Sequence, residues 1–285
     1  MDQIKTVCVC GAGTMGSGIA QVCATAGYQT ILYDVDKIAV KKAKANIENG
    51  LQKLLHKQKI FVTEYVQVLN RLKFTSNIKD CIAALIIEAI IEKPEAKISL
   101  FDQLEYHNSD SKIIFASNTS SLSLTKIASA LKNTGKLIGL HFFNPAPVMK
   151  LVEVVTTDYT KQETVQHVLS FVKSLNKIPV ICKDSPGFIV NRVARPYYIE
   201  SLRLVEEGKA TYETVDKLLE ARGFKMGPFK LMDVIGNDIN YAVSCSLYSQ
   251  LNNPERLMPS TIQKEKVEKN ELGKKTGFGY YQYNS

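Results

Sequence analysis

His141 and Glu153 are the residues of this sequence whose types and surroundings first suggest acid–base chemistry. Both lie in HFFNPAPVMKLVEVV, residues 141–155, a segment that is otherwise apolar and interrupted by prolines. A carboxylate that is buried, ionised and unpaired costs several kcal/mol, so Glu153 must be either exposed or paired. Histidine changes charge near neutral pH, which makes His141 a candidate proton donor and acceptor. Taken alone, however, each residue also fits a structural role at a strand end.

A second chemical signal is the glycine-rich turn GAGTMG near the start of the chain. It follows a short β-rich run and precedes apolar residues at helical spacing, and a second strand then ends at Asp34. This order matches the dinucleotide-binding fingerprint, in which the helix N-terminus faces a pyrophosphate. A carboxylate at Asp34 suits ribose hydroxyls and repels a 2′-phosphate, so NAD is favoured over NADP. The turn residues are Gly11, Ala12, Gly13, Thr14, Met15 and Gly16.

Strand-like and helix-like segments alternate from the start of the chain to about residue 183. Such alternation predicts an α/β fold with a Rossmann-type, doubly wound, mostly parallel sheet and right-handed crossovers. Beyond the two strands beside the glycine turn, further strands are expected at 84–90, 112–117, 136–142, 151–155 and 178–182. Helices are expected between most of them, for example at 94–107, 124–131 and 161–175.

The character of the sequence changes near residue 184, which predicts a second domain. Asp184 and Ser185 before Pro186 have the pattern of a cap that begins a helix. Helices are expected beyond it at 187–206, 212–221, 228–250 and 259–269. We therefore expect an NAD-binding domain over 1–184 and an all-helical domain over 185–285. The helical domain should mediate self-association, because its segments 197–206 and 228–250 carry apolar residues on more than one side.

Composition restricts the class of protein. The chain has 285 residues, of which 45% are hydrophobic and 22% charged, as in ordinary globular proteins. Its six cysteines lack CxxC spacing and nearby histidines, which predicts reduced thiols in a cytoplasm and no metal site. The longest apolar run, 82–91, contains Glu88 and is too short to span a membrane. No targeting segment is expected, since strand-like sequence begins at about Ile4.

The net charge of +8 suits an anionic partner. No basic motif interleaved with aromatic residues supports nucleic acid, so a polyphosphate small molecule is the other candidate. Residues 36–59 form a lysine-rich, weakly apolar helical segment that follows the second strand. This basic segment is either a solvated face or a clamp for a second anionic ligand.

Eight motifs in order carry a resemblance to a known family. They are GAGTMGSGIA (11–20), IIEAIIE (86–92), ASNTSS (116–121), HFFNP (141–145), VMKLVEVV (148–155), KDSPGFIVNR (183–192), MGPFKLMDVIG (226–236) and GKKTGFGYY (273–281). The sequence closely resembles the L-3-hydroxyacyl-CoA dehydrogenases, particularly the short bacterial 3-hydroxybutyryl-CoA dehydrogenases, over nearly its whole length. The resemblance implies reversible, NAD-linked oxidation of a (3S)-3-hydroxyacyl-CoA, and a place in fatty-acid or butanoate metabolism.

The resemblance also implies roles for individual residues. His141 would be the general acid/base and Glu153 the carboxylate that orients it and stabilises its charged form. Ser120 would hydrogen-bond the reacting oxygen, and Asn191 would contact the substrate carbonyl region. The site would then lie in the cleft between the domains.

Cofactor, substrate and partner residues follow from the same resemblance. Beyond the glycine turn, the NAD residues would be Asp34, Glu92, Lys97, Ser120, Asn144 and Lys275. The residues that bind CoA would be Gly50, Lys53 and Lys57 on the basic segment, together with Ser120. The expected assembly is a homodimer through the helical domain. One departure from the family is the polar sequence Arg195-Pro196-Tyr197-Tyr198, where aliphatic residues are usual, and it could alter the preferred acyl chain.

Two other functions compete with this interpretation. One is a hydroxyacid dehydrogenase of similar architecture that acts on a free acid, although such enzymes usually use a lysine as the acid/base. The other is a non-catalytic dinucleotide-binding protein, either a redox sensor or a structural protein. His141, Glu153 and the basic segment disfavour the first of these functions. The presence of Ser120, His141, Glu153 and Asn191 together disfavours the second.

Overall fold

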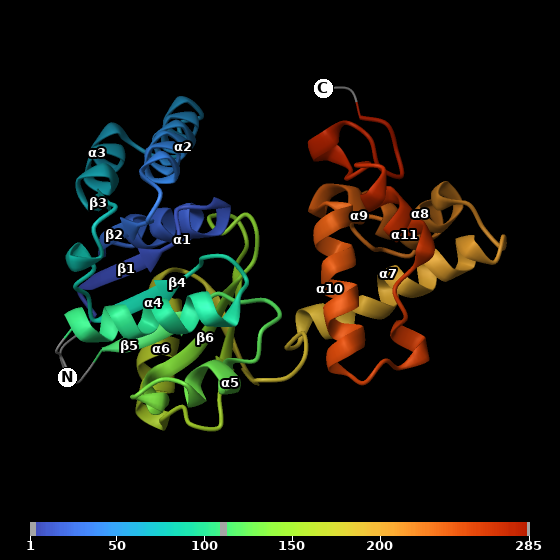
Figure 1. Ribbon diagram of the computed structural model, residues 1–285. Coiled ribbons are helices and arrows are strands. Elements are labelled where there is room, and N and C mark those ends of the chain that lie inside the picture. Colours follow the sequence, from blue (N-terminus) through green and yellow to red (C-terminus); the bar gives the residue numbers. More distant parts are fainter. Residues whose placement is uncertain (1–3, 109–112, 284–285) are drawn as a thin grey trace. The chain divides into compact units, whose positions relative to one another are not determined.

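The computed structural model describes residues 4–108 and 113–283, and the chain divides into two compact units, 1–185 and 186–285 (Figure 1). The first is called the sheet unit, because it is built on an eight-stranded sheet. The second is called the helical unit, because α-helices make up most of it.

The strands of the sheet unit follow the order β3-β2-β1-β4-β5-β6-β7-β8. Neighbouring strands are parallel except for β6 and β7, which are antiparallel. The strands are β1 (Thr6–Cys10), β2 (Gln29–Tyr33), β3 (Leu72–Thr75), β4 (Leu85–Glu88), β5 (Ile114–Ser117), β6 (Leu137–Phe142), β7 (Leu151–Thr156) and β8 (Ile178–Lys183). The predicted Rossmann-type, mostly parallel sheet is therefore confirmed. Lys112, where one predicted strand begins, lies outside the described residues.

Helices connect the strands of the sheet unit. They are α1 (Thr14–Thr25), α2 (Lys37–His56), α3 (Val62–Asn70), α4 (Pro94–His107), α5 (Leu124–Ser129) and α6 (Gln162–Ser174), with short 3₁₀ turns η1 (Ile78–Asp80) and η2 (Thr134–Lys136). The central strands β4, β5 and β6 are buried along their whole length, as expected when helices cover both faces of a parallel sheet. Their continuous runs of apolar residues therefore fit interior strands.

The segment between the basic helix and β4 differs from what the sequence suggested. Its helix α3 and edge strand β3 have no counterpart among the predicted elements. Figure 1 shows α3 beside α2, and the two helices are in contact. The strand β3 has only four residues, and Lys73 is exposed in its middle. An edge strand this short and partly polar gives little periodic signal.

The helical unit is an assembly of helices around a small aromatic core. The helices are α7 (Val190–Glu206), α8 (Tyr212–Ala221), α9 (Pro228–Ile235), α10 (Asn237–Gln250) and α11 (Thr261–Glu268), with 3₁₀ turns η3 (Glu255–Leu257) and η4 (Lys274–Thr276). The core includes Tyr198, Leu202, Phe229, Met232 and Tyr280. Within residues 4–108 and 113–283, no helix has both the length and the apolar character that a membrane span requires.

The prediction of one helix over 228–250 is wrong. The chain forms two helices there, α9 and α10, which meet at Gly236. The backbone of Gly236 has a φ of 103°, which glycine adopts without the steric penalty that other residues incur. Apolar spacing continues across this turn, so periodicity alone did not reveal the break.

The prediction that Asp184 caps the next helix is also wrong, since α7 begins only at Val190. The Asp184 carboxylate instead accepts hydrogen bonds from Ser123 Oγ at 2.9 Å and from the backbone N–H of Thr125 at 2.8 Å. It thereby satisfies a free donor in the first turn of α5, a helix far back in the sequence. The local pattern was that of a cap, but the helix it serves could not be read from neighbouring residues.

Candidate active site

His141 and Glu153 lie on the antiparallel strands β6 and β7 and face each other directly in the register. Directly opposed residues project their side chains to the same face of a sheet, within reach of one another. His141 Nδ1 is 2.7 Å from Glu153 Oε2, and both side chains are buried. The carboxylate therefore has the partner that its burial demands. The short contact favours the tautomer with the proton on Nδ1, which leaves Nε2 as an acceptor.

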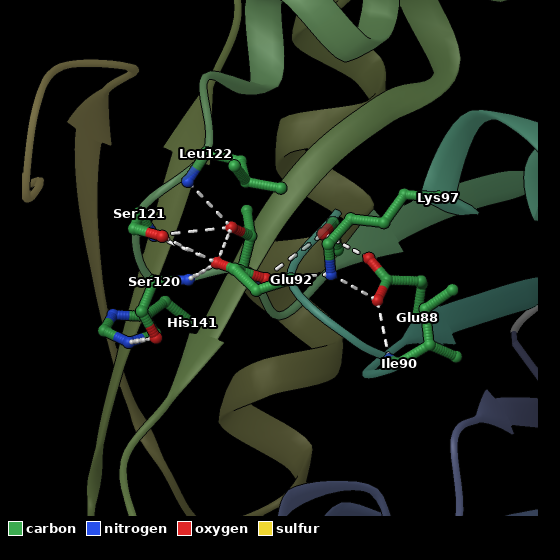
Figure 2. A network of polar contacts seen from close by, with 10 residues as sticks. Glu88, Ile90, Glu92, Lys97, Ser120, Ser121, Leu122 and His141 are labelled. Carbon is green, nitrogen blue, oxygen red and sulfur yellow. Dashed lines mark hydrogen bonds and ion pairs between the residues drawn. The ribbon is translucent and has the colours of Figure 1, made fainter. Parts of the chain in front are cut away.

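Ser120 completes a chain of three side chains. Its Oγ lies 2.9 Å from His141 Nε2 (Figure 2). With the Nδ1 proton directed to Glu153, the serine hydroxyl donates to Nε2. The ring of Phe143 packs against the imidazole with centroids 4.6 Å apart. The arrangement Glu153–His141–Ser120 can hold, accept and return a proton at Nε2.

A buried lysine lies between two carboxylates, on the side of Glu92 that faces away from Ser120 (Figure 2). Lys97, in the first turns of α4, is 1% exposed, and its Nζ lies 2.6 Å from Glu88 Oε1. Its distance to Glu92 Oε2 is 3.1 Å. Glu88 ends β4 and is fully buried. The ammonium group of Lys97 therefore forms ion pairs with both carboxylates.

The second oxygen of Glu92 holds the loop that carries Ser120. Glu92 Oε1 accepts hydrogen bonds from the backbone N–H of Ser120 at 3.1 Å and of Ser121 at 3.2 Å. The hydroxyls of Ser121 and Thr119 donate to the same oxygen. Burial alone raises the pKa of Glu92, but the charge of Lys97 and these hydrogen bonds outweigh it and lower that pKa below its usual value. Glu92 is therefore held as an anion that anchors the loop.

Glu88 anchors the start of the same loop. Its Oε2 accepts from Ser117 Oγ at 2.5 Å, and its Oε1 accepts from the backbone N–H of Ile90 at 2.7 Å. Sequence reasoning assigned Glu88 and Ser117 no role. The argument applied to Glu153 could have found Glu88, because a carboxylate inside the buried strand LIIE also needs a partner.

The glycine turn between β1 and α1 has the shape that a dinucleotide requires. A Cβ on Gly11 would meet the carbonyl oxygen of Ala89 at 2.3 Å, and one on Gly16 would meet that of Gly11 at 1.8 Å. At Gly13 a Cβ would meet nothing within 4 Å, so the turn is open there. No side chain caps α1, and its first N–H groups can serve a phosphate. These residues fit NAD.

Asp34 lies directly after β2, at the same edge of the sheet as the glycine turn. Its Oδ2 accepts a hydrogen bond from the backbone N–H of Ala12 at 2.7 Å. The carboxylate is therefore tied to the turn and is half-buried. The ends of β1, β4, β5 and β6 bring Gly11, Glu88, Ser117 and His141 to that edge, where ligands bind in open α/β sheets.

The remaining residues expected to bind ligands lie elsewhere in the two units. Gly50 and Lys53 lie three residues apart in the last turns of α2, Lys57 follows directly after the helix, and both lysines are exposed. Asn144 follows β6 and precedes Pro145 across a cis peptide bond. Asn191 and Lys275 belong to the helical unit. There Lys275 Nζ forms an ion pair with Asp238 at 2.6 Å.

Comparison with known proteins gives matches along nearly the whole chain. Residues 6–185 match the family model of the 3-hydroxyacyl-CoA dehydrogenase NAD binding domain, and residues 187–283 match that of the 3-hydroxyacyl-CoA dehydrogenase C-terminal domain. A 3-hydroxyadipyl-CoA dehydrogenase of Escherichia coli is 44% identical over 99% of this chain, which spans 60% of that relative's length.

Two further relatives are matched over almost their full length. The mitochondrial hydroxyacyl-coenzyme A dehydrogenase of Sus scrofa is 40% identical, with 98% of this chain and 91% of the relative covered. The crystal structure of (S)-3-hydroxybutyryl-CoA dehydrogenase from Ralstonia eutropha superposes with a TM-score of 0.94 at 36% identity, and it covers 99% of this chain and 100% of the other. These similarities extend through both units of the chain.

Proposed function

The chain belongs to the 3-hydroxyacyl-CoA dehydrogenase family, and from this premise we propose that it oxidises a short-chain (3S)-3-hydroxyacyl-CoA reversibly to the 3-oxoacyl-CoA, with NAD as cofactor. The two bacterial relatives are named for acyl chains of different kinds, 3-hydroxyadipyl and 3-hydroxybutyryl. Both names denote the CoA thioester of a short 3-hydroxy acid, and this is the substrate class that we assign. The observation that carries the proposal is the chain Glu153–His141–Ser120, with contacts of 2.7 and 2.9 Å.

His141 acts as the general acid/base of this reaction. In the oxidation, Nε2 accepts the proton of the substrate's 3-hydroxyl group, and in the reduction it returns that proton to the same oxygen. Glu153 keeps the other ring proton on Nδ1 and stabilises the imidazolium that forms. NAD, when bound, takes up the hydride that leaves C3 of the substrate. With substrate bound, the one proton of the Ser120 hydroxyl is donated to the oxygen on C3 in place of Nε2. Asn191 binds the thioester carbonyl region, and the family resemblance implies both roles.

Two groups of residues bind the rest of the ligands. The glycine turn and Asp34 hold the pyrophosphate and the adenosine ribose of NAD, and the resemblance adds Glu92, Lys97, Asn144 and Lys275. Glu92 and Lys97 serve by fixing the loop that contains Ser120, since Lys97 Nζ is enclosed between two carboxylates. Exposed ammonium groups at the end of α2 attract the phosphates of CoA, and they include those of Lys53 in the helix and of Lys57 directly after it.

We expect rapid oxidation of NADH with acetoacetyl-CoA, and much slower turnover with NADPH or with free acetoacetate. The carboxylate of Asp34 disfavours the additional phosphate of NADPH, and the free acid lacks the CoA that the basic helix attracts. Initial rates from the absorbance of the reduced cofactor measure all three. Preference for the free acid would support a hydroxyacid dehydrogenase instead. Tight NADH binding without turnover on any substrate would support a non-catalytic binding protein.

We also propose that the protein is a homodimer formed through its helical unit. Large apolar side chains are exposed on helices of this unit and on the segments between them, and they include Val193, Leu218, Phe224, Ile239 and Met258. Apolar side chains that one chain leaves exposed can be buried against a second copy where they gather on one surface. Multi-angle light scattering should give twice the 31.8 kDa mass of one chain. A mass equal to that of one chain would rule the dimer out.

A further inference from the structure

The helical unit contains one buried arginine with only neutral partners. Arg195, in the second turn of α7, is 2% exposed. Its Nη1 donates to the backbone carbonyl of Asn240 at 3.0 Å and to Ser244 Oγ at 2.9 Å, and the amide oxygen of Asn240 lies at 3.3 Å. The guanidinium carbon lies 5.0 Å from the centre of the Tyr198 ring. These contacts hold the guanidinium in one position against α10.

The charge of Arg195 has no anion beside it in the part of the chain that the structure describes, since no carboxylate there lies within ion-pair distance of it. Burial accordingly lowers the pKa of Arg195 to about 10, against the opposing effect of Tyr198. Lys97 is buried to a similar degree, but it contacts two carboxylates. An arginine buried without a counterion costs stability, which a bound anion would offset.

Part of the guanidinium also has donors to spare. A guanidinium carries N–H donors on Nε, Nη1 and Nη2. Among the described residues, Nη1 is the nitrogen with good acceptors, Nε makes one long contact of 3.5 Å to the Asn191 carbonyl, and Nη2 has no protein acceptor. A planar carboxylate suits the side of the guanidinium that carries Nε and Nη2, because it can accept hydrogen bonds from two guanidinium nitrogens at once.

The position of Arg195 connects it with the acyl chain. It follows Asn191 by four residues, so the two side chains lie on the same face of α7, about 6 Å apart along the helix axis. Under the proposed function, on which this inference rests, Asn191 binds the thioester carbonyl region. A short methylene chain beyond C3 spans a similar length. A charged group at the end of that chain could therefore reach the spare donors of Arg195.

We propose that Arg195 determines acyl-chain specificity by binding a carboxylate at the far end of the acyl chain. The preferred substrates are then CoA thioesters of short 3-hydroxy dicarboxylic acids. Asn240, Ser244 and Tyr198 hold the guanidinium in place, and the incoming carboxylate accepts hydrogen bonds from the donors that the protein leaves unused. A chain that ends in a methyl group leaves those donors unpaired, and it binds less well for that reason.

The test compares two six-carbon substrates that differ only at the chain end. One is the 3-oxoacyl-CoA with a terminal carboxylate and the other is 3-oxohexanoyl-CoA, each assayed by NADH oxidation with acetoacetyl-CoA as reference. For the wild type we expect kcat/KM to be about ten- to hundredfold higher for the carboxylate-ended substrate, as for a charge-assisted hydrogen bond. This comparison needs no variant, so it decides the question even if a substitution prevents folding.

Variants then assign the preference to Arg195. Arg195→Met should remove the advantage of the carboxylate-ended substrate, mainly through KM, and leave kcat/KM for 3-oxohexanoyl-CoA within a few-fold of the wild type. Arg195→Lys should restore part of the preference, because it keeps the charge without the planar fork. The matched control is Arg192→Met, on the exposed side of the same helix, which should leave the ratio of the two substrates unchanged.

The outcomes separate this inference from the proposed function. Equal kcat/KM for the two wild-type substrates, or a preference for the methyl-ended chain, would overturn the role of Arg195 while turnover of acetoacetyl-CoA upholds the dehydrogenase. Equal losses on both substrates in Arg195→Met would show that the arginine serves only to join α7 to α10. No turnover of any 3-oxoacyl-CoA would overturn the proposed function, and this inference with it.

Discussion

Replacing His141 with alanine should lower kcat for the NADH-dependent reduction of acetoacetyl-CoA by about 10²–10⁴-fold, the usual contribution of a positioned general acid or base. The substitution removes the only group in the Glu153–His141–Ser120 chain that can hand a proton to the substrate oxygen. It leaves the glycine turn and Asp34 intact. The dissociation constant of NADH, followed by its fluorescence, should therefore change little. Stopped-flow and steady-state rates measure the loss.

Two further variants make this result specific. Glu153→Gln keeps the size of the side chain but removes the charge 2.7 Å from Nδ1, so the ring is no longer held in one tautomer and the imidazolium is not stabilised. It should lower kcat and leave NADH binding intact. His107→Ala, at the end of α4, is the control histidine and should be fully active. A fully active His141→Ala enzyme would remove this histidine from the mechanism.

Replacing Lys97 with methionine should lower the free energy of unfolding by about 3–5 kcal/mol, the range for breaking a buried ion pair from one side. The substitution leaves Glu88, which is fully buried, and Glu92 without the cation that balances them. Methionine has a similar volume, so the effect reports charge rather than a cavity. Urea unfolding followed by circular dichroism measures it. Release of Glu92 should also free the loop at Ser120 and reduce kcat.

A double-mutant cycle shows whether the effect belongs to the ion pair. Glu88→Gln in the Lys97→Met background removes the unpaired buried carboxylate, so the double variant should be more stable than the sum of the two single losses predicts. The control is the exposed pair Lys264–Glu268 on α11, where Lys264→Met should change stability by less than about 1 kcal/mol. If Lys97→Met also lowered the free energy of unfolding by less than about 1 kcal/mol, the lysine would not be stabilising the buried carboxylates.

The parts of the fold that follow from local pattern could be predicted from the sequence. The turn at Gly11–Gly16, the strand that ends before Asp34 and the buried strands β4 to β6 each have a signal contained in a few adjacent residues. The break at Gly236 and the helix α3 lacked such a signal. At Gly236 the apolar spacing continues through the turn, and around α3 and β3 the elements are short and only partly buried.

In the candidate site, too, the residues with a local signal could be predicted and the contacts that depend on packing could not. His141 and Glu153 are separated by one strand connection, and the sequence could suggest them because each is unusual in its own segment. The contacts of Lys97 with Glu88 and Glu92, and of Glu92 with the backbone at Ser120, depend on how α4 lies against the ends of β4 and β5. Packing of that kind is not contained in any short stretch of the sequence. For the same reason, Asp184 was assigned to the wrong helix.

The strands β6 and β7 form the antiparallel pair of this sheet, and His141 and Glu153 lie on these two strands. The histidine–glutamate pair therefore depends on one local strand pairing and could be transferred to another protein. One strand pairing and its connecting loop specify the pair completely, so it could be grafted onto an antiparallel hairpin of another protein. A slip of one residue in that pairing would turn one member of the pair to the opposite face. Ser120 could not be transferred in the same way, because contacts with three separate strand ends and a helix fix its position.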